Sequence, residues 1–285
     1  MTVPADQSTA RAFERYRDGG YRKVPGWLNR GGCEGLIAAD AAQRALAVEG
    51  HIGEIGIDGG RSLFLLCHLA RPGETVVGID PFVTRVRMPG ETHEQRVTTF
   101  ERQRALHLPP GCDLCVLKAN SLDLAAEDLL GAAGGPFRLV HIDGSHKAEY
   151  VRHDLEVAGG ALGPRGIIVL DDILAEPHPG VVSALVAYQA EHPEAALAPF
   201  ALGGGKAYLA HASCAEAYRE RFAALRAPLV DTASFLGHDV VLFAYEKLDD
   251  IMPAWLWRRL RGLPGVRQFR REAWRRFGYP PTKLI

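Results

Sequence analysis

Short apolar runs alternate with segments of helical pattern along most of this chain. Such runs, bounded by glycine and polar residues, are typical of buried strands. Strands that alternate with helices favour a parallel sheet covered on both faces, since each helix carries the chain back before the next strand. The predicted strands are Ile52–Ile57, Thr75–Ile79, Cys112–Lys118, Phe137–Ile142 and Gly166–Leu170.

The predicted helices lie before, between and after these strands. They cover approximately Cys33–Val48, Arg61–Ala70, Glu94–Leu106, Ala148–Ala158, Val181–Glu191 and Glu216–Leu225. Beyond Glu191 the pattern changes, and two more strands are predicted at Lys206–Ala210 and Asp239–Tyr245. We therefore expect an α/β fold of the Rossmann-like kind, with a mostly parallel sheet of seven strands. Residues 1–50 are predicted to form a helical or lid segment, 51–248 the main domain and 249–285 a helical tail.

Composition excludes several classes of protein. The 285 residues are 47% hydrophobic with a net charge of −1, which suits a globular domain and gives no overall attraction to nucleic acid or membrane. Five cysteines do not indicate a disulfide framework, and Cys112 and Cys115 are interpreted as buried thiols. No apolar run reaches the roughly 18 residues of a membrane span, and Met1–Lys23 lacks a signal-peptide core. We expect a cytoplasmic protein.

The C-terminal tail differs from the rest of the chain in charge. From Ile251 onward there are nine basic residues and one acid, so the tail is about +8 and the remainder about −9. Trp255, Trp257 and Trp274 lie among the arginines. Such a segment could lie on an anionic membrane surface, bind nucleic acid, or dock on the acidic body of its own or a partner subunit. Docking is favoured, and we expect a homo-oligomer.

A glycine-rich turn follows the first predicted strand and precedes a helix. The sequence there reads Gly53-Glu54-Ile55-Gly56-Ile57-Asp58-Gly59-Gly60-Arg61-Ser62. Glycines allow a tight turn and a close approach to a ligand, and the free N–H groups at a helix start attract an anionic group. The spacing differs from the G-x-G-x-x-G of dinucleotide enzymes. It reads acidic-x-Gly-x-Asp-Gly-Gly, with the acid inside the strand. This turn predicts a cofactor site.

Polar residues also follow the second and third strands. Asp80 ends the second strand, twenty-two residues after Asp58, where a carboxylate can accept both ribose hydroxyls of a nucleoside. Asn120 and Ser121 follow the third strand and could contact an adenine edge, although both are ordinary turn residues as well. These positions predict a nucleoside cofactor without specifying which one.

Carboxylates converge at the ends of the fourth and fifth strands. Asp143 ends one strand, and Asp171 and Asp172 end the other. In open α/β sheets ligands collect at the carboxyl ends of the strands. Like charges this close are unfavourable unless a cation neutralises them, and hard oxygen ligands favour Mg²⁺, with Mn²⁺ or Ca²⁺ as alternatives. The alternative is that Asp171 and Asp172 merely cap a loop or helix.

These motifs resemble class I S-adenosylmethionine-dependent methyltransferases. The first motif of that class is E/D-x-G-x-x-x-G, which Glu54, Gly56 and Gly60 match. The resemblance implies that the two glycines pass under the methionine part of the cofactor. It implies that Glu54 anchors the loop or the cofactor's amino group, and that Ser62 lies near the cofactor's carboxylate.

A narrower resemblance concerns the fourth and fifth strands. Ile142-Asp143-Gly144-Ser145-His146 and Asp171-Asp172 are similar to motifs of metal-dependent sugar O-methyltransferases and cephalosporin hydroxylase-like proteins. The resemblance spans about residues 27–206 and implies that Asp143, Asp171 and Asp172 bind a metal beside the cofactor's methyl group. The expected activity is therefore methyl transfer to a hydroxyl of a sugar, glycoside or similar polyol. A catechol-like acceptor, another small molecule, or a non-catalytic partner of this fold are the alternatives.

The base that removes the acceptor's proton is left open between two residues. Some sugar enzymes carry an aspartate two positions after the first metal ligand, but Ser145 stands there. Catechol-type enzymes carry a lysine three positions after it, and His146 stands there. An imidazole that titrates near neutrality suits a general base, so His146 is favoured, with Asp143 as the alternative. The loop with Arg85, Arg87 and His93 could contact the acceptor or simply be solvated.

Overall fold

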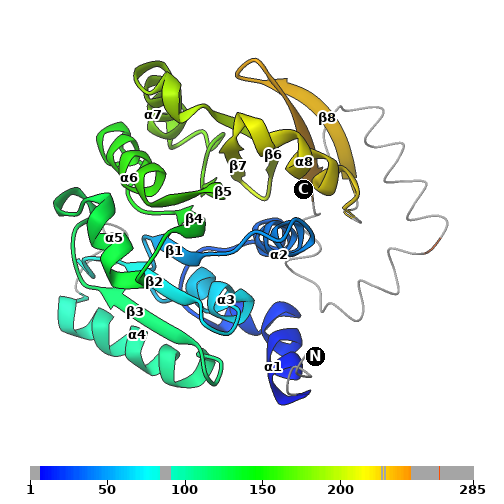
Figure 1. The fold of residues 1–285 in the computed structure, drawn as a ribbon. Coiled ribbons are helices and arrows are strands. Elements are labelled where there is room, and N and C mark those ends of the chain that lie inside the picture. Colours follow the sequence, from blue (N-terminus) through cyan, green and yellow to red (C-terminus); the bar gives the residue numbers. More distant parts are fainter. Residues whose placement is uncertain (1–6, 84–90, 226, 228, 245–262, 264–285) are drawn as a thin grey trace.

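The computed structural model describes residues 7–83, 91–225, 227, 229–244 and 263. These residues form one sheet with helices on both faces (Figure 1). Nine strands lie in the order β3-β2-β1-β4-β5-β7-β6-β9-β8. β1 to β5 pair in parallel, and β7 pairs antiparallel with both β5 and β6. The α/β prediction is therefore confirmed.

The strand bounds are β1 (His51–Ile55), β2 (Thr75–Ile79), β3 (Asp113–Leu117), β4 (Phe137–Ile142), β5 (Leu162–Leu170), β6 (Leu197–Gly203), β7 (Lys206–His211), β8 (Leu229–Phe235) and β9 (His238–Ala244). The α-helices are α1 (Gln7–Arg17), α2 (Arg30–Ala45), α3 (Arg61–Leu69), α4 (His93–His107), α5 (Ala126–Ala133), α6 (Ala148–Ala161), α7 (Pro179–Glu191) and α8 (Ala212–Ala223). Short 3₁₀ turns occur at Gly20–Lys23, Ser121–Asp123 and Pro193–Ala195.

The count of seven strands was too low, because β6 and β8 were not predicted. β6 carries Pro199 and several small residues, which weaken a strand signal, and it forms only because β7 and β9 pair with it. β8 alternates polar residues along the sheet edge and pairs with β9 alone. The hairpin β8–β9 therefore extends a seven-strand arrangement, β3-β2-β1-β4-β5-β7-β6, by two strands.

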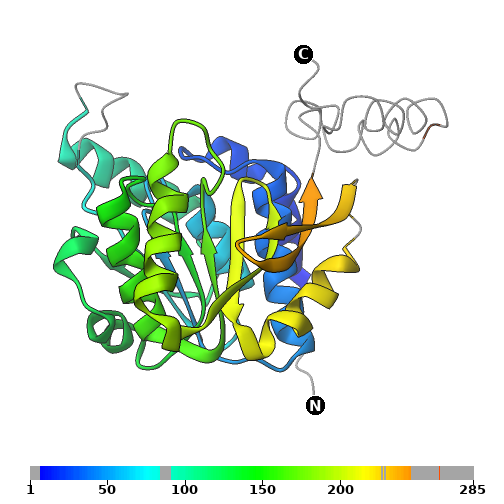
Figure 2. The same ribbon diagram turned by 90° about the horizontal axis from the view of Figure 1, so that it is seen from above.

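Two apolar layers hold the helices to the sheet. One layer contains buried side chains from α2, α3, α4 and α8, including Phe64, Phe100 and Phe222. The other contains side chains from α5, α6 and α7, including Leu155 and Leu185. Figures 1 and 2 show these two groups of helices on opposite sides of the sheet. This three-layer arrangement leaves the carboxyl ends of the strands exposed at one edge of the domain.

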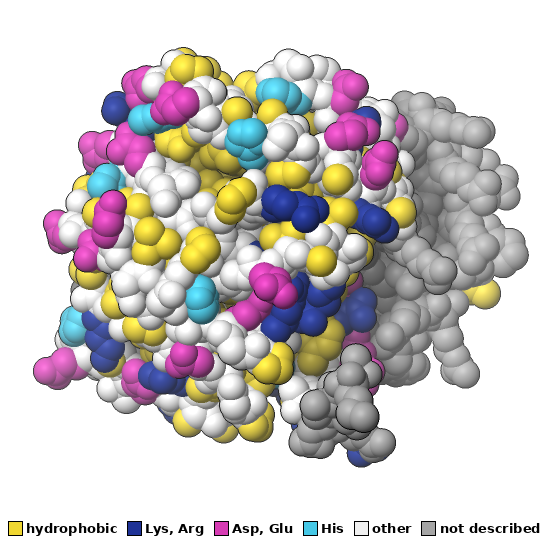
Figure 3. Space-filling view, viewed as in Figure 1, with side chains coloured by type: hydrophobic (Ala, Val, Ile, Leu, Met, Phe, Trp, Pro, Cys, Tyr) yellow, Lys and Arg dark blue, Asp and Glu magenta, His cyan; other side chains and the backbone are white. Residues whose placement is uncertain are grey.

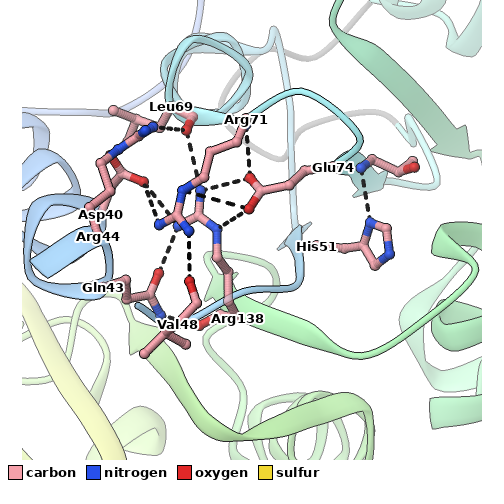
Figure 4. A network of polar contacts seen from close by, with 10 residues as sticks. Asp40, Gln43, Arg44, Val48, His51, Leu69, Arg71, Glu74 and Arg138 are labelled. Carbon is pink, nitrogen blue, oxygen red and sulfur yellow. Dashed lines mark hydrogen bonds and ion pairs between the residues drawn. The ribbon is translucent and has the colours of Figure 1, made fainter. Parts of the chain in front are cut away.

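A buried polar network ties α2 to the amino-terminal end of β4 (Figure 4). Arg138 is fully buried in β4, and its guanidinium forms ion pairs with Asp40 of α2 (3.0 Å) and Glu74 (2.8 Å). It also donates a hydrogen bond to Gln43 Oε1 at 2.7 Å. A buried charge is tolerated only when its partners satisfy it, and the planar guanidinium does so from several directions. The network therefore holds helix α2, from the expected N-terminal segment, on the main domain.

The predicted tail of residues 249–285 lies outside the described residues, apart from Leu263. So do Arg85 and Arg87 of the predicted substrate loop. None of the described helices is both long and apolar enough to cross a membrane. The surface in Figure 3 intersperses acidic and basic side chains over the face viewed.

Candidate active site

The glycine-rich turn after β1 has the backbone that its sequence predicts. Gly56, Asp58 and Gly60 have φ of 89°, 48° and 94°, in the left-handed region that favours glycine. A Cβ on Gly56 would lie 2.2 Å from the carbonyl oxygen of Asp143, so only glycine allows the two loops to meet. Gly60 is the N-cap of α3, and Ser62 is buried in the first turn of that helix. The helix start therefore faces the carboxyl edge of the sheet, where its N–H groups can bind an anionic group.

Asp80, at the end of β2, anchors this turn. Its Oδ2 accepts hydrogen bonds from the backbone N–H of Ile57 (3.1 Å) and Asp58 (2.8 Å), and its Oδ1 accepts one from Phe82 (2.6 Å). Burial raises the pKa of Asp80. The carboxylate thus already holds the loop in shape. Each oxygen has more than one lone pair, so a ribose hydroxyl could still be accepted.

Arg96 reaches the same turn from α4. Its guanidinium lies 2.9 Å from Asp58 Oδ1 and is almost fully buried. It also lies over the Phe82 ring, with 6.0 Å between the guanidinium carbon and the ring centroid. Asp58, which was predicted as a cofactor ligand, is therefore paired with an arginine that the sequence did not indicate.

Glu54 and His141 form a buried pair on the neighbouring strands β1 and β4. His141 Nδ1 lies 2.6 Å from Glu54 Oε1, and neither side chain is exposed. Glu54 Oε2 and His141 Nε2 are buried without a hydrogen-bond partner among the described residues. An unsatisfied buried carboxylate oxygen is costly, so Glu54 Oε2 is a candidate acceptor for a polar group of a ligand.

Asp143 and Asp171 lie together at the ends of β4 and β5, with a lysine. Lys206 Nζ lies 2.7 Å from Asp171 Oδ2, and the lysine is 2% exposed. Burial by itself raises the pKa of Asp171, but the Lys206 ammonium, His141 and a hydrogen bond with Asp143 together lower that pKa to about 2. Burial, followed by repulsion from Asp171, raises the pKa of Asp143 well above its usual range. Asp171 is therefore the ionised partner of Lys206, and Asp143 is the carboxyl of the pair that takes up a proton more readily.

The turn between β6 and β7 places Lys206 in the cluster. Gly204 and Gly205 have positive φ, as in a tight two-residue hairpin. A Cβ on Gly204 would lie 2.2 Å from the backbone nitrogen of Gly32, so the turn packs directly on the start of α2. Asn29 caps α2 and donates a hydrogen bond to the Gly204 carbonyl at 3.2 Å. The N-terminal segment thus closes over the β7 side of the site.

Asp172 belongs to a different group from Asp171. Its Oδ2 lies 3.2 Å from His146 Nε2 and 3.6 Å from His178 Nε2. The two imidazoles stack, with 4.1 Å between ring centroids. His146 Nε2 also lies 3.9 Å from Asp143 Oδ1, so His146 stands between the two groups. Burial lowers the pKa of His146 below its usual value, which favours the neutral imidazole.

Asn120 and Ser121 lie at the end of β3, as predicted. The Asn120 side chain caps the following 3₁₀ turn by accepting a hydrogen bond from Leu122 N–H. Ser121 is buried, and its carbonyl lies 3.1 Å from His153 Nε2. Asp154 of α6 is fully buried nearby, and burial raises its pKa to about 6.

The predicted site residues thus lie along the carboxyl edge of the sheet, in separate groups. The structure adds Lys206, His178 and Arg96, which the sequence interpretation did not include. A lysine that opens an apolar strand after a glycine turn was a usable signal for Lys206. His178 and Arg96 are close to the site only through packing of the α7 and α4 starts, which no local pattern shows.

Comparisons with known proteins agree with this arrangement. A family model described as a methyltransferase domain matches residues 54–173. The solved structure of the O-methyltransferase NovP superposes with a TM-score of 0.54 at 13% identity, over 71% of this chain and 99% of that one. The matched span runs from Glu54 to Ile173 and includes the glycine turn and both acidic strand ends.

Two further solved structures are similar at lower TM-scores. CalS11, a TDP-rhamnose 3'-O-methyltransferase of calicheamicin biosynthesis, is 18% identical with a TM-score of 0.47, over 74% of this chain and 97% of that one. TomG from Streptomyces achromogenes, an O-methyltransferase solved with S-adenosylmethionine, is 18% identical with a TM-score of 0.42, over 73% and 90%. A search of curated protein sequences gives no significant match. Residues 54–173 thus match a methyltransferase domain model, and the chain shares the fold of the O-methyltransferase NovP.

Proposed function

We propose that this protein is an S-adenosylmethionine- and divalent-metal-dependent O-methyltransferase that acts on a hydroxyl of a sugar, glycoside or similar polyol. The observation that carries the proposal is the cluster of carboxylates and histidines at the ends of β4 and β5, directly beside the glycine turn. The likeness to an O-methyltransferase fold supports methyl transfer to oxygen. The choice of sugar rests on the motifs Ile142–His146 and Asp171–Asp172.

The cofactor would lie along the carboxyl edge of the sheet. Glu54 Oε2 has no hydrogen-bond partner in the part of the chain that the structure describes, and it could accept hydrogen bonds from the ammonium of the methionine part. Gly56 and Gly60 allow close approach, and the α3 start near Ser62 suits the methionine carboxylate. Asp80 would accept the ribose hydroxyls, while Asn120 and Ser121 would lie at the adenine edge.

The residues also fit a divalent cation. Glu54, Asp143 and Asp171 bring three carboxylates into one buried region, and Lys206 is the ammonium found there. The raised pKa of Asp143, caused first by burial and then by repulsion from Asp171, supports a cation beside this carboxylate. Oxygen donors favour Mg²⁺, Mn²⁺ or Ca²⁺, and Asp143, Asp171 and Asp172 would hold the ion. When bound, a divalent ion lowers the pKa of an adjacent hydroxyl.

The proton of the acceptor hydroxyl would go to His146 Nε2. This imidazole is partly exposed, lies 3.2 Å from Asp172, and is kept neutral by its lowered pKa. The acceptor oxygen then attacks the sulfonium methyl carbon as the carbon–sulfur bond breaks, which leaves S-adenosylhomocysteine. Asp143 is the alternative base, since it lies on the same side of the site and its pKa is raised. The main contribution of the protein to the reaction rate would be to align the acceptor oxygen, the methyl carbon and the sulfur.

The test is a methyl-donor assay against sugars, glycosides and catechols, with and without Mg²⁺. We expect turnover with a polyol acceptor, loss of turnover in EDTA, and none with the Asp171→Ala variant. Calorimetry with S-adenosylmethionine checks the cofactor separately. Absence of cofactor binding would refute the enzyme and favour a non-catalytic partner of this fold. Turnover that is insensitive to EDTA would refute the metal requirement alone.

A further inference from the structure

The histidine pair beside Asp172 has the composition of a transition-metal site. Among the described residues, one ligand atom each from His146, Asp172 and His178 lie within 4.8 Å of one another. All three side chains are partly exposed, at 27%, 35% and 29%, so an ion can reach them from solvent. Two imidazoles and a carboxylate favour ions of borderline softness, such as Zn²⁺, over the hard ion Mg²⁺, which prefers oxygen ligands.

The distances within this group suit a single ion. Zn–N and Zn–O bonds of about 2.0–2.1 Å in a tetrahedral site separate neighbouring ligand atoms by roughly 3.3 Å. The Asp172 oxygen lies 3.2 Å from one imidazole nitrogen and 3.6 Å from the other. His146 Nε2 makes no hydrogen bond among the described residues, so it can bind an ion in the tautomer that carries its proton on Nδ1. Rotation about the broad χ2 torsion of the stacked imidazoles can aim both nitrogens at one point.

The three residues come from three segments, after β4, after β5 and before α7, and backbone packing brings them together. Asp172 has a φ of 52°, a strained value for a non-glycine residue, directly after β5. A Cβ on Gly180 would lie 2.6 Å from the carbonyl oxygen of His146, so this glycine lets the start of α7 pack on the segment after β4. His178 is the residue that precedes α7 and is therefore carried to His146. The arrangement therefore depends on tertiary packing between these segments.

We propose that His146, Asp172 and His178 bind a borderline divalent transition-metal ion such as Zn²⁺, and that its binding switches off methyl transfer. The inhibitory part rests on the proposed function, because His146 is there the base. An imidazole nitrogen bound to Zn²⁺ has no lone pair left for a proton. Asp172 is shared with the proposed Mg²⁺ ligands, so the two ions also compete for one carboxylate. Zn²⁺ is thus expected to oppose Mg²⁺.

The binding test uses the full chain, stripped of metal and titrated with Co²⁺, whose visible absorption reports imidazole ligation and low coordination number. We expect saturable binding that Zn²⁺ displaces. His178→Ala should weaken Co²⁺ binding by at least about tenfold, since even loss of an outer-shell partner weakens metal affinity by 10–100-fold. His192→Ala is the matched control, because His192 belongs to another histidine–carboxylate group, with Glu156 and Glu191. It should bind Co²⁺ as the wild type does.

The activity test measures Zn²⁺ inhibition at saturating Mg²⁺. Wild type and His192→Ala should be inhibited, whereas the Mg²⁺-dependent turnover of His178→Ala, whatever its absolute rate, should resist Zn²⁺ by at least tenfold. His178→Gln, with circular dichroism of both variants, guards against a folding defect. Equal Co²⁺ affinity or equal Zn²⁺ inhibition in wild type and the His178 variants would overturn the site. If no methyl transfer occurs at all, the proposed function fails, while Co²⁺ binding still decides the metal site.

Discussion

Lys206→Met removes the ammonium from the acidic cluster and retains most of the aliphatic stem. In the wild type the side chains of Lys206 and Asp171 are 2% and 12% exposed, and their charged atoms lie 2.7 Å apart. Because water cannot replace the lost partner, the change leaves an uncompensated buried carboxylate beside Asp143. Breaking one side of a buried pair costs about 3–5 kcal/mol. We expect the free energy of unfolding at pH 7 to fall by about 3–4 kcal/mol, since Asp171 can take up a proton and limit the cost.

Urea unfolding followed by circular dichroism measures this loss of free energy. In thermal unfolding the same loss lowers the Tm by roughly 10 °C. The loss should shrink at pH 4.5, because a carboxyl of the pair then protonates readily in the variant. Millimolar Mg²⁺ should restore part of the stability if the cluster accepts a divalent ion. A double-mutant cycle with Asp171→Asn isolates the pair. If Lys206→Met unfolds within 0.5 kcal/mol of the wild type, or if the cycle shows no coupling, Lys206 does not serve as the counter-ion.

Three other substitutions test separate parts of the fold and site. Gly56→Ala should weaken S-adenosylmethionine binding by at least about tenfold in calorimetry. The reason is that a Cβ would meet the Asp143 carbonyl and that the φ of Gly56 is positive. An affinity equal to that of the wild type would contradict the predicted cofactor loop. Asp154→Asn should stabilise the protein at pH 8 by up to about 3 kcal/mol and have little effect at pH 4. Burial raises the pKa of Asp154 in the folded protein to about 6, above the 3.8 of a free aspartate. The wild type is therefore stabilised below pH 3.8 and loses this contribution as pH rises through 6, so a gain that is equal at both pH values would show another cause. Arg138→Met should cost about 1.5–3 kcal/mol in urea unfolding, because it removes charged hydrogen bonds to Glu74 and Gln43, whereas Asp40 and Glu74 keep partners in Arg44 and Arg71. Arg138→Lys should recover only part of this loss, and full recovery would mean that the guanidinium geometry is unimportant.

Local sequence was enough to predict the α/β class, most strands and the position of the site. The runs Thr75–Ile79 and Phe137–Ile142 match β2 and β4 residue for residue, because strands buried on both faces are apolar throughout. The glycine turn could be predicted because positive φ at Gly56 and Gly60 is a property of single residues. Strand ends in a parallel sheet also meet at one edge whatever the details of packing, so Asp143 and Asp171 were correctly expected to be neighbours.

Side-chain partners at that edge depended on the tertiary structure. The sequence predicted a charge deficit at Asp143 and Asp171, but a cation can come from solvent or from any remote part of the chain. Lys206 supplies part of it only because the β6–β7 turn packs on α2. Asp172 follows Asp171 directly, yet its left-handed backbone turns its carboxylate toward His146 and His178. Residue type and spacing specify which charges an edge will carry, whereas the distances that pair them are decided by packing between segments far apart in the chain.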